Sequence, residues 1–90
     1  MINKRWEESG ENHILYFTPF YEEREVARIW QDEDGDWMYS SAETMDDNVY
    51  LDDARTLEEA KNEADTRVNA HYVDQIGYYT ELLERFEKGE

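Results

Sequence analysis

Cysteine is absent from this 90-residue chain, and proline occurs only once. Without thiols the protein has no disulfide framework and no cysteine-ligated metal site. Long apolar runs are missing as well, since none approaches the roughly 20 residues that span a bilayer. The first ten residues, MINKRWEESG, lack the apolar segment of a signal peptide. These absences predict a cytoplasmic protein that does not enter a membrane.

Basic residues are scarce. Nine Lys and Arg, of which three are Lys, stand against 24 Asp and Glu and give a formal net charge of -15 at pH 7. Such an imbalance would permit disorder, but aromatic residues make up 14% of the chain, and disordered chains are poor in them. We therefore expect a folded domain with a small aromatic core and an acidic surface. That surface repels nucleic acid and anionic lipid and attracts basic protein patches.

The length predicts one domain, 1–90, because a chain this short has no room for two hydrophobic cores. Small domains bury a modest share of their surface when they fold, so association adds useful stability. A homodimer or a bound partner is compatible with this length.

The first 53 residues have the pattern of a β-rich region. Runs of β-branched and aromatic residues predict strands at 13–17, 25–31 and 37–41. Pro19 follows the first run, where a strand can end but does not continue. Weaker patterns indicate an edge strand at 3–8 and a short strand at 49–51, within an acidic loop over 42–53.

Residues 57–87 are expected to form one long helix. Thr56 and Glu59 have the spacing of a capping box, and an apolar stripe with steps of three and four follows. The stripe consists of Leu57, Ala60, Ala64, Val68, Tyr72, Ile76, Tyr79, Leu83 and Phe86. A kink or break is expected at Gly77, because glycine inside a helix costs about 1 kcal/mol relative to alanine; an unbroken helix would project and meet a partner. The fold class is therefore α+β, with a three- or four-stranded antiparallel sheet packed against one long C-terminal helix.

The stretch QDEDGDW at 31–37 allows a calcium loop or a hairpin turn. Counted from Asp32, a twelve-residue loop places oxygen ligands at the EF-hand positions, which hold Asp32, Asp34, Asp36, Ser40 and Glu43. Trp37, however, stands where that loop requires glycine, and the preceding residues favour a strand. Asp34-Gly35 is a strong hairpin signal. We therefore expect a turn and no metal site, which leaves Asp32, Glu33 and Asp36 without a structural reason.

Catalytic constellations are not evident. His71 and Asp74 are one helical turn apart, which could orient an imidazole, but nothing else completes a nucleophile, a metal site or a phosphate cradle. We expect no enzymatic activity and no cofactor.

The excess of negative charge goes beyond what solubility requires, since a net charge of about 2 to 8 in magnitude is ample for a small domain. Carboxylates on alternate strand residues stand about 6.8 Å apart, and helical i, i+4 neighbours about 6 Å apart. Both spacings are close to the roughly 7 Å between successive phosphates of one nucleic-acid strand. The acids also occur in clusters along the chain, which are Asp32-Glu33-Asp34-Asp36, Asp46-Asp47, Asp52-Asp53 and Glu58-Glu59.

With these clusters on a short cysteine-free chain, the sequence resembles the small acidic DNA-mimic proteins of phages and mobile elements, the anti-CRISPR and anti-restriction inhibitors. The resemblance is one of character over the whole chain and involves no specific motif. It implies a cytoplasmic, non-catalytic inhibitor, acting in the host cell if phage-encoded. Such a protein occupies the basic groove of a nucleic-acid-binding complex and does not bind nucleic acid itself.

The candidate partner-binding residues are the acids of these four clusters together with Trp37, Tyr39 and Tyr78. Tyr39 and Tyr78 are expected to be partly exposed, where tyrosine favours interfaces, whereas Tyr72 and Tyr79 are expected in the core. Two alternatives remain open. One is an immunity or antitoxin-like protein that covers a basic toxin through aromatic anchors; the other is a salt-adapted acidic protein with no mimic role.

Overall fold

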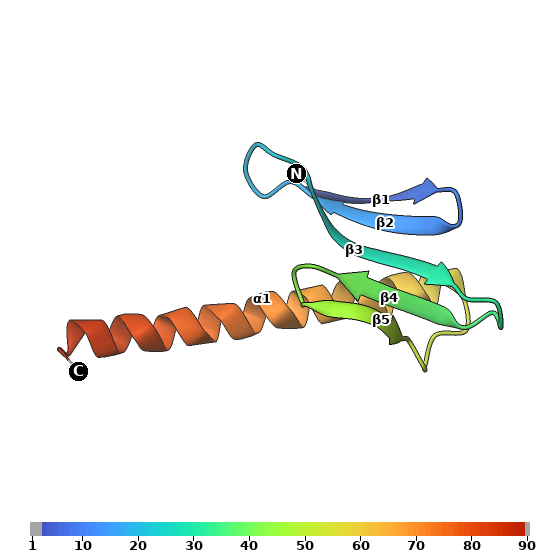
Figure 1. The fold of residues 1–90 in the computed structure, drawn as a ribbon. Coiled ribbons are helices and arrows are strands. Elements are labelled where there is room, and N and C mark those ends of the chain that lie inside the picture. The colour runs from blue at the N-terminus through green and yellow to red at the C-terminus, as the bar shows by residue number, and fades with distance from the viewer. Residues whose placement is uncertain (1–2, 90) are drawn as a thin grey trace.

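The computed structural model describes residues 3–89, which form five strands and one helix (Figure 1). The elements are β1 (Lys4–Ser9), β2 (Asn12–Phe17), β3 (Arg24–Gln31), β4 (Trp37–Ser41), β5 (Asp46–Tyr50) and α1 (Leu57–Glu87). The strands pair in chain order as an antiparallel meander. The α+β class with one long C-terminal helix is confirmed. The sheet has five strands instead of three or four, because both weaker patterns form strands and β5 extends back to Asp46.

Two glycines allow the tight connections of this meander. Gly10 joins β1 to β2 with φ +63°, and Gly35 joins β3 to β4 with φ +83°. This left-handed region costs glycine little and strains residues that carry a Cβ. The hairpin predicted at Asp34-Gly35 is confirmed, and of these two residues Gly35 alone has a positive φ. The strand register then pairs Leu15 with Ala27 and Ile29 with Tyr39.

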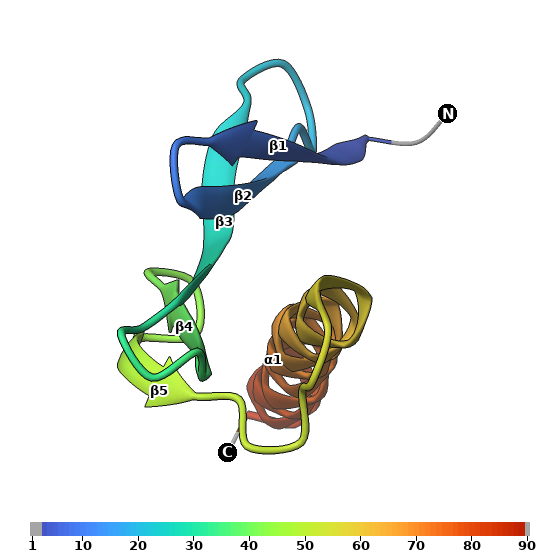
Figure 2. The same ribbon diagram turned by 90° about the vertical axis from the view of Figure 1, so that its right-hand side faces the viewer.

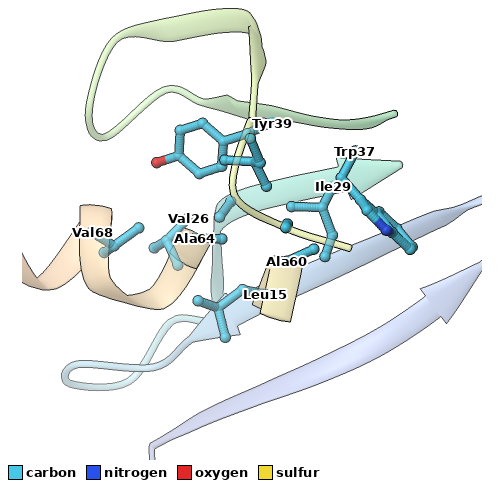
Figure 3. Packing of buried hydrophobic residues seen from close by; sticks show 11 residues of the cluster. Leu15, Val26, Ile29, Trp37, Tyr39, Ala60, Ala64 and Val68 are labelled. Atoms are coloured by element: carbon cyan, nitrogen blue, oxygen red, sulfur yellow. The ribbon is translucent and has the colours of Figure 1, made fainter. Parts of the chain in front are cut away.

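The first half of α1 covers one face of the sheet (Figure 2). Ala60 and Ala64 have no exposed surface, and Val68 keeps 5%. These small side chains let the helix lie close to the larger residues of the sheet, which are Leu15, Val26, Ile29, Trp37 and Tyr39 (Figure 3). The spacing of four places all three on one helical face. The core is therefore a thin layer in which the sheet supplies the bulk.

The capping box predicted at the start of α1 is confirmed. The Thr56 hydroxyl accepts a hydrogen bond from the Glu59 N–H at 3.2 Å, and the Glu59 carboxylate accepts one from the Arg55 N–H at 3.3 Å. The first bond satisfies an N–H group that the first helical turn leaves without a partner, and the second ties the Glu59 carboxylate to the residue before the cap. The boundary of the helix is thus set by local chemistry.

The second half of α1 runs beyond the sheet (Figure 1). The expected break at Gly77 is absent, since the helix is continuous from Leu57 to Glu87. The projection makes the molecule elongated, with extents of 54 × 29 × 18 Å and a radius of gyration of 15.8 Å; a compact domain of this length has about 12 Å. No helix within residues 3–89 combines the length and the apolar character that crossing a membrane requires.

Candidate functional site

One end of the sheet brings together four parts of the chain: two connections between strands, the segment after β5, and the start of α1. This end lies on the right-hand side of Figure 1 and faces the viewer in Figure 2. In a meander every second connection falls at the same end, so the β1–β2 and β3–β4 turns lie together. The Leu51 N–H donates to the Trp37 carbonyl at 2.9 Å, which brings the chain leaving β5 to the same place. We call this the acidic end, and it contains Glu11, Asp32, Glu33, Asp34, Asp36, Asp52, Asp53, Glu58 and Glu59.

The β3–β4 turn is organised by Asp32. One of its carboxylate oxygens accepts the backbone N–H groups of Asp34 and Asp36, both at 2.9 Å. The backbone N–H of Asp32 donates to the Asp36 carbonyl at 2.9 Å, and the Gly35 N–H donates to the Asp32 carbonyl at 3.1 Å. The expectation that Asp32 has no structural role is wrong. Its carboxylate accepts hydrogen bonds from two backbone N–H groups for which the turn has no backbone acceptor. Glu33, Asp34 and Asp36 remain exposed.

The fold contradicts the interpretation of this stretch as a calcium-binding loop. Residues 37–41 form β4, so Ser40 and Glu43 do not belong to a loop that encircles Asp32. Carboxylate oxygens of Asp32, Asp34 and Asp36 do lie within 4.8 Å of one another, the one such group in the part of the chain that the structure describes. This separation is below the roughly 7 Å between phosphates. The three aspartates therefore present one concentrated negative charge.

The start of α1 adds further acids to this end. Glu58 and Glu59 lie in the first helical turn, where the partial positive charge of the helix terminus stabilises them. Asp52 and Asp53 are exposed in the segment that leads to the helix. Of these four, only Glu59 has a structural role, as the cap described above. The others are free to meet a partner.

Basic residues are paired elsewhere in the molecule. Seven ion pairs join described residues: Lys4–Asp65, Arg5–Glu7, Arg5–Glu23, Arg24–Glu43, Arg28–Glu25, Arg67–Glu63 and Arg85–Glu81. None of the nine carboxylates of the acidic end takes part in them. Arg55 is the single basic residue within the segments that form this end. The negative charge of the acidic end is thus left largely uncompensated, while that of the sheet is partly neutralised.

The structure separates other candidates from this site. Asp46 and Asp47 open β5, at the opposite end of the sheet, about 14 Å away along a five-residue strand. Asp46 accepts a hydrogen bond from the Thr44 hydroxyl at 2.7 Å and so belongs to the β4–β5 turn. Tyr78 is 54% exposed, as expected, but lies on the projecting half of α1, about 28 Å along the helix from Glu59.

Trp37 and Tyr39 belong to the core. Trp37 is 8% exposed and Tyr39 is fully buried, so the expectation of a partly exposed Tyr39 is wrong. The Tyr39 hydroxyl shares a hydrogen bond of 2.9 Å with the Thr44 hydroxyl, and the Arg67 guanidinium lies over its ring at 5.5 Å from the centroid. Both aromatics face the helix because β4 alternates its side chains across a covered sheet. Neither offers a surface to a partner.

Tyr72 marks the point where α1 leaves the sheet. It packs against the core cluster, and its ring centroid lies 6.1 Å from that of Phe17. Burial of the phenol, followed by the negative charge of Glu43, raises the pKa of Tyr72 above its ordinary value of 10.0, while nearby Arg24 opposes the shift. The His71 ring lies beside that of Tyr72 in a tilted arrangement, with a centroid separation of 5.8 Å and an interplanar angle of 55°. Among residues 3–89, no hydrogen bond joins His71 to Asp74.

Exposed apolar residues form a second feature, which the sequence analysis anticipated only as the alternative to a break at Gly77. Tyr79 was expected in the core and is 63% exposed. The other large apolar side chains of the projecting half of α1 are exposed as well, as are three residues in the connections at the sheet end opposite the acidic end: Phe20, Tyr21 and Met45. The sequence does contain a signal for this difference, because the residues of the apolar stripe change from alanine to large side chains along the helix. Small residues suit a helix that packs closely on a sheet, and large ones do not.

No protein-family model matches the chain, and neither a curated protein nor a solved structure shows significant similarity to it.

Proposed function

We propose that this protein is a non-catalytic inhibitor that inserts its acidic end into the nucleic-acid-binding groove of a basic protein or complex, such as a CRISPR effector, in the cytoplasm. The observation that carries the proposal is the segregation of charge. Nine carboxylates gather at one end of a folded sheet and take part in none of the ion pairs among residues 3–89, whereas six of the nine Lys and Arg are paired elsewhere. Self-repulsion of this kind opposes folding, and a basic groove would relieve it.

The geometry supports a rigid negative surface. Turns anchored to strands and the first turn of a capped helix hold the backbone that carries the carboxylates, so little loop entropy is lost on binding. The exposed members Glu33, Asp34 and Asp36 project from the tip of the β3–β4 hairpin. Such a tip enters a groove that accommodates a nucleic-acid backbone. Contacts of this type are charge pairs and weaken steeply as salt rises.

Displacement of fluorescent DNA from purified CRISPR effector and restriction complexes tests the proposal. A variant neutralised at five exposed positions of the acidic end keeps both structural acids, Asp32 and Glu59; its substitutions are Glu33→Gln, Asp34→Asn, Asp36→Asn, Asp52→Asn and Asp53→Asn. We expect wild type to displace DNA at low salt and the variant to lose at least tenfold in potency. If wild type displaces DNA from none of the complexes, the proposal is wrong.

A matched control separates the site from net charge. The substitutions Glu22→Gln, Asp47→Asn, Asp74→Asn, Glu84→Gln and Glu87→Gln remove the same five charges at positions outside the acidic end. This control is expected to retain most of the potency of wild type. Equal losses in the two variants would assign the effect to total charge instead of to the acidic end.

The two alternative functions predict different behaviour. A salt-adapted protein would unfold in dilute buffer and gain stability as salt is added, whereas the proposed inhibitor folds cooperatively at low ionic strength. An immunity-like protein would hold its partner near 1 M salt through aromatic anchors. Burial of Trp37 and Tyr39 removes two of the three anchors considered, which favours the electrostatic mode.

A further inference from the structure

We propose that the projecting half of α1 is a dimerisation surface and that its occupant is the same segment of a second copy of this chain, in antiparallel orientation. This inference does not depend on the proposed function. Residues 73–87 extend roughly 22 Å beyond the packed part of the helix. Helices of about this length are marginal in water without a packed face, and this one also contains Gly77.

The apolar side chains of this segment form one continuous face. Ile76, Tyr79, Leu83 and Phe86 follow the alternating three- and four-residue spacing of a coiled-coil seam, and Tyr72 joins them to the core. Together with Tyr78 and Leu82 they fall within an arc of about 160° at 100° per residue. A shallow, open apolar depression lies along the seam between Tyr72 and Leu83. The face is thus a direct extension of the one that covers the sheet.

The exposed apolar side chains supply a large part of the area that a dimer interface requires. Tyr78, Tyr79 and Phe86 are 54%, 63% and 82% exposed, and aromatic side chains bury about 150–250 Å² each, so these three alone offer about 300–500 Å². The aliphatic residues of the same arc, Ile76, Leu82 and Leu83, are 44–66% exposed and add to this area. A standard interface needs about 800 Å² per partner.

The distribution of charge favours a second copy of this chain, instead of a basic partner, as the molecule that covers the apolar face. The charged residues Asp74, Glu81 and Glu84 lie outside the apolar arc, and Arg85 and Glu87 lie at its two edges. Glu81 is already paired with Arg85 at 3.0 Å. The seam itself therefore has almost no acid for a basic helix to bind. Residues 73–88 have four acids and two bases, a net charge of -2 out of -15 for the chain. Two such segments meet with little repulsion.

The antiparallel orientation follows from where the remaining charge lies. The acidic end surrounds the start of α1, so parallel pairing would bring two strongly negative sheets side by side (Figure 1). Antiparallel pairing places the two acidic ends at opposite extremes of the dimer. It also brings the last turn of each helix toward the apolar end of the other sheet, where Phe20, Tyr21 and Met45 are 84%, 97% and 89% exposed.

Sedimentation equilibrium of the full chain tests the pairing. Wild type is expected to have twice the monomer mass of 10.9 kDa at micromolar concentration. The double variant Ile76→Glu, Leu83→Glu should raise the dimer dissociation constant by about 100-fold or more, because each carboxylate would be buried in the seam. Arg85→Glu changes the net charge by the same two units at a position outside the seam and should remain dimeric. A monomeric wild type at 100 μM, or a double variant that stays dimeric, would overturn the proposal.

Single cysteines test the orientation, since the chain has none of its own. Thr80 lies beside the seam near the middle of the segment, and Glu87 lies on the same side of the seam, one heptad further on, at its end. In an antiparallel pair, Thr80→Cys should form a disulfide-linked dimer on oxidation and Glu87→Cys should not. Crosslinking of Glu87→Cys as readily as Thr80→Cys would refute the antiparallel arrangement. Circular dichroism of each variant confirms that the helix is retained, because all substituted side chains are solvent-exposed in the monomer.

Discussion

The two halves of α1 share one periodic stripe but lie in opposite surroundings. In the first half, the stripe residues Ala60, Ala64 and Val68 are buried against the sheet. In the second half, larger stripe residues such as Ile76 and Phe86 are exposed at 66% and 82%. Periodicity alone therefore identifies an apolar face and does not say what covers it. The size of the side chains carries that information, because only small residues permit a helix to approach a sheet that already supplies bulky groups.

The largest contrast should appear at two valines, one in each half. Val68→Asp would bury an unpaired carboxylate in the core, which should lower the free energy of unfolding by 3 kcal/mol or more, at about the limit of a small domain. Val73→Asp places the same group at a position where the side chain is 57% exposed. This substitution should change the free energy of unfolding by about 0.5 kcal/mol or less. Urea denaturation followed by tryptophan fluorescence compares the two. Similar losses would mean that the second half is packed in the monomer.

Two aspartates at the acidic end should also differ in how much their substitution changes the free energy of unfolding. Asp32→Ala removes the acceptor of two backbone N–H groups and should cost about 1–2 kcal/mol of stability. Asp34→Ala removes an exposed charge from a crowded cluster and should be neutral or slightly stabilising at low salt. Chemical denaturation at 20 mM and 500 mM salt measures both. Equal destabilisation would contradict the assignment of the turn to Asp32.

Gly77 provides a smaller test of the projecting half. A Cβ added there meets no atom within 4 Å, and the glycine has no positive φ. Gly77→Ala should therefore strengthen the helix by up to about 1 kcal/mol. Amide hydrogen exchange over residues 73–87 should slow, while exchange in the sheet should not change. Faster exchange in the helix would show that the glycine serves a conformation other than a straight helix.

The smallest effect is expected at Tyr72, between the two halves. Burial raises its pKa in the folded state above 10.0, so the unfolded chain loses this proton at a lower pH than the folded protein does. Stability should therefore fall as pH rises from the ordinary value through the raised one. Tyr72→Phe should reduce that slope, measured by denaturation between pH 9 and 11, and leave stability near pH 7 little changed. Identical slopes in both proteins would count against the burial of the phenol.

Much of the fold was predictable because its signals are local. The capping box at Thr56, the hairpin glycine at Gly35 and the β-branched runs each act within a few residues, and each appears where the sequence placed it. The straight course past Gly77 was not predictable in this way, since the cost of about 1 kcal/mol is small against the rest of a long helix. The role of Asp32 was equally hidden, because the acids of the turn look alike until the backbone is folded.

The sequence by itself determined the α+β class, the limits of the helix and the excess of negative charge, all of which depend on composition and short-range spacing. The tertiary structure decided which of those charges lie together. Strand direction sends Asp46 and Asp47 to one end of the sheet and Asp52 and Asp53 to the other, although only four residues separate the two pairs in the chain. It also decided that Trp37 and Tyr39 face the helix while Tyr79 faces solvent. The physical reason is that burial depends on what a strand or helix packs against, and neighbours in sequence do not specify that partner.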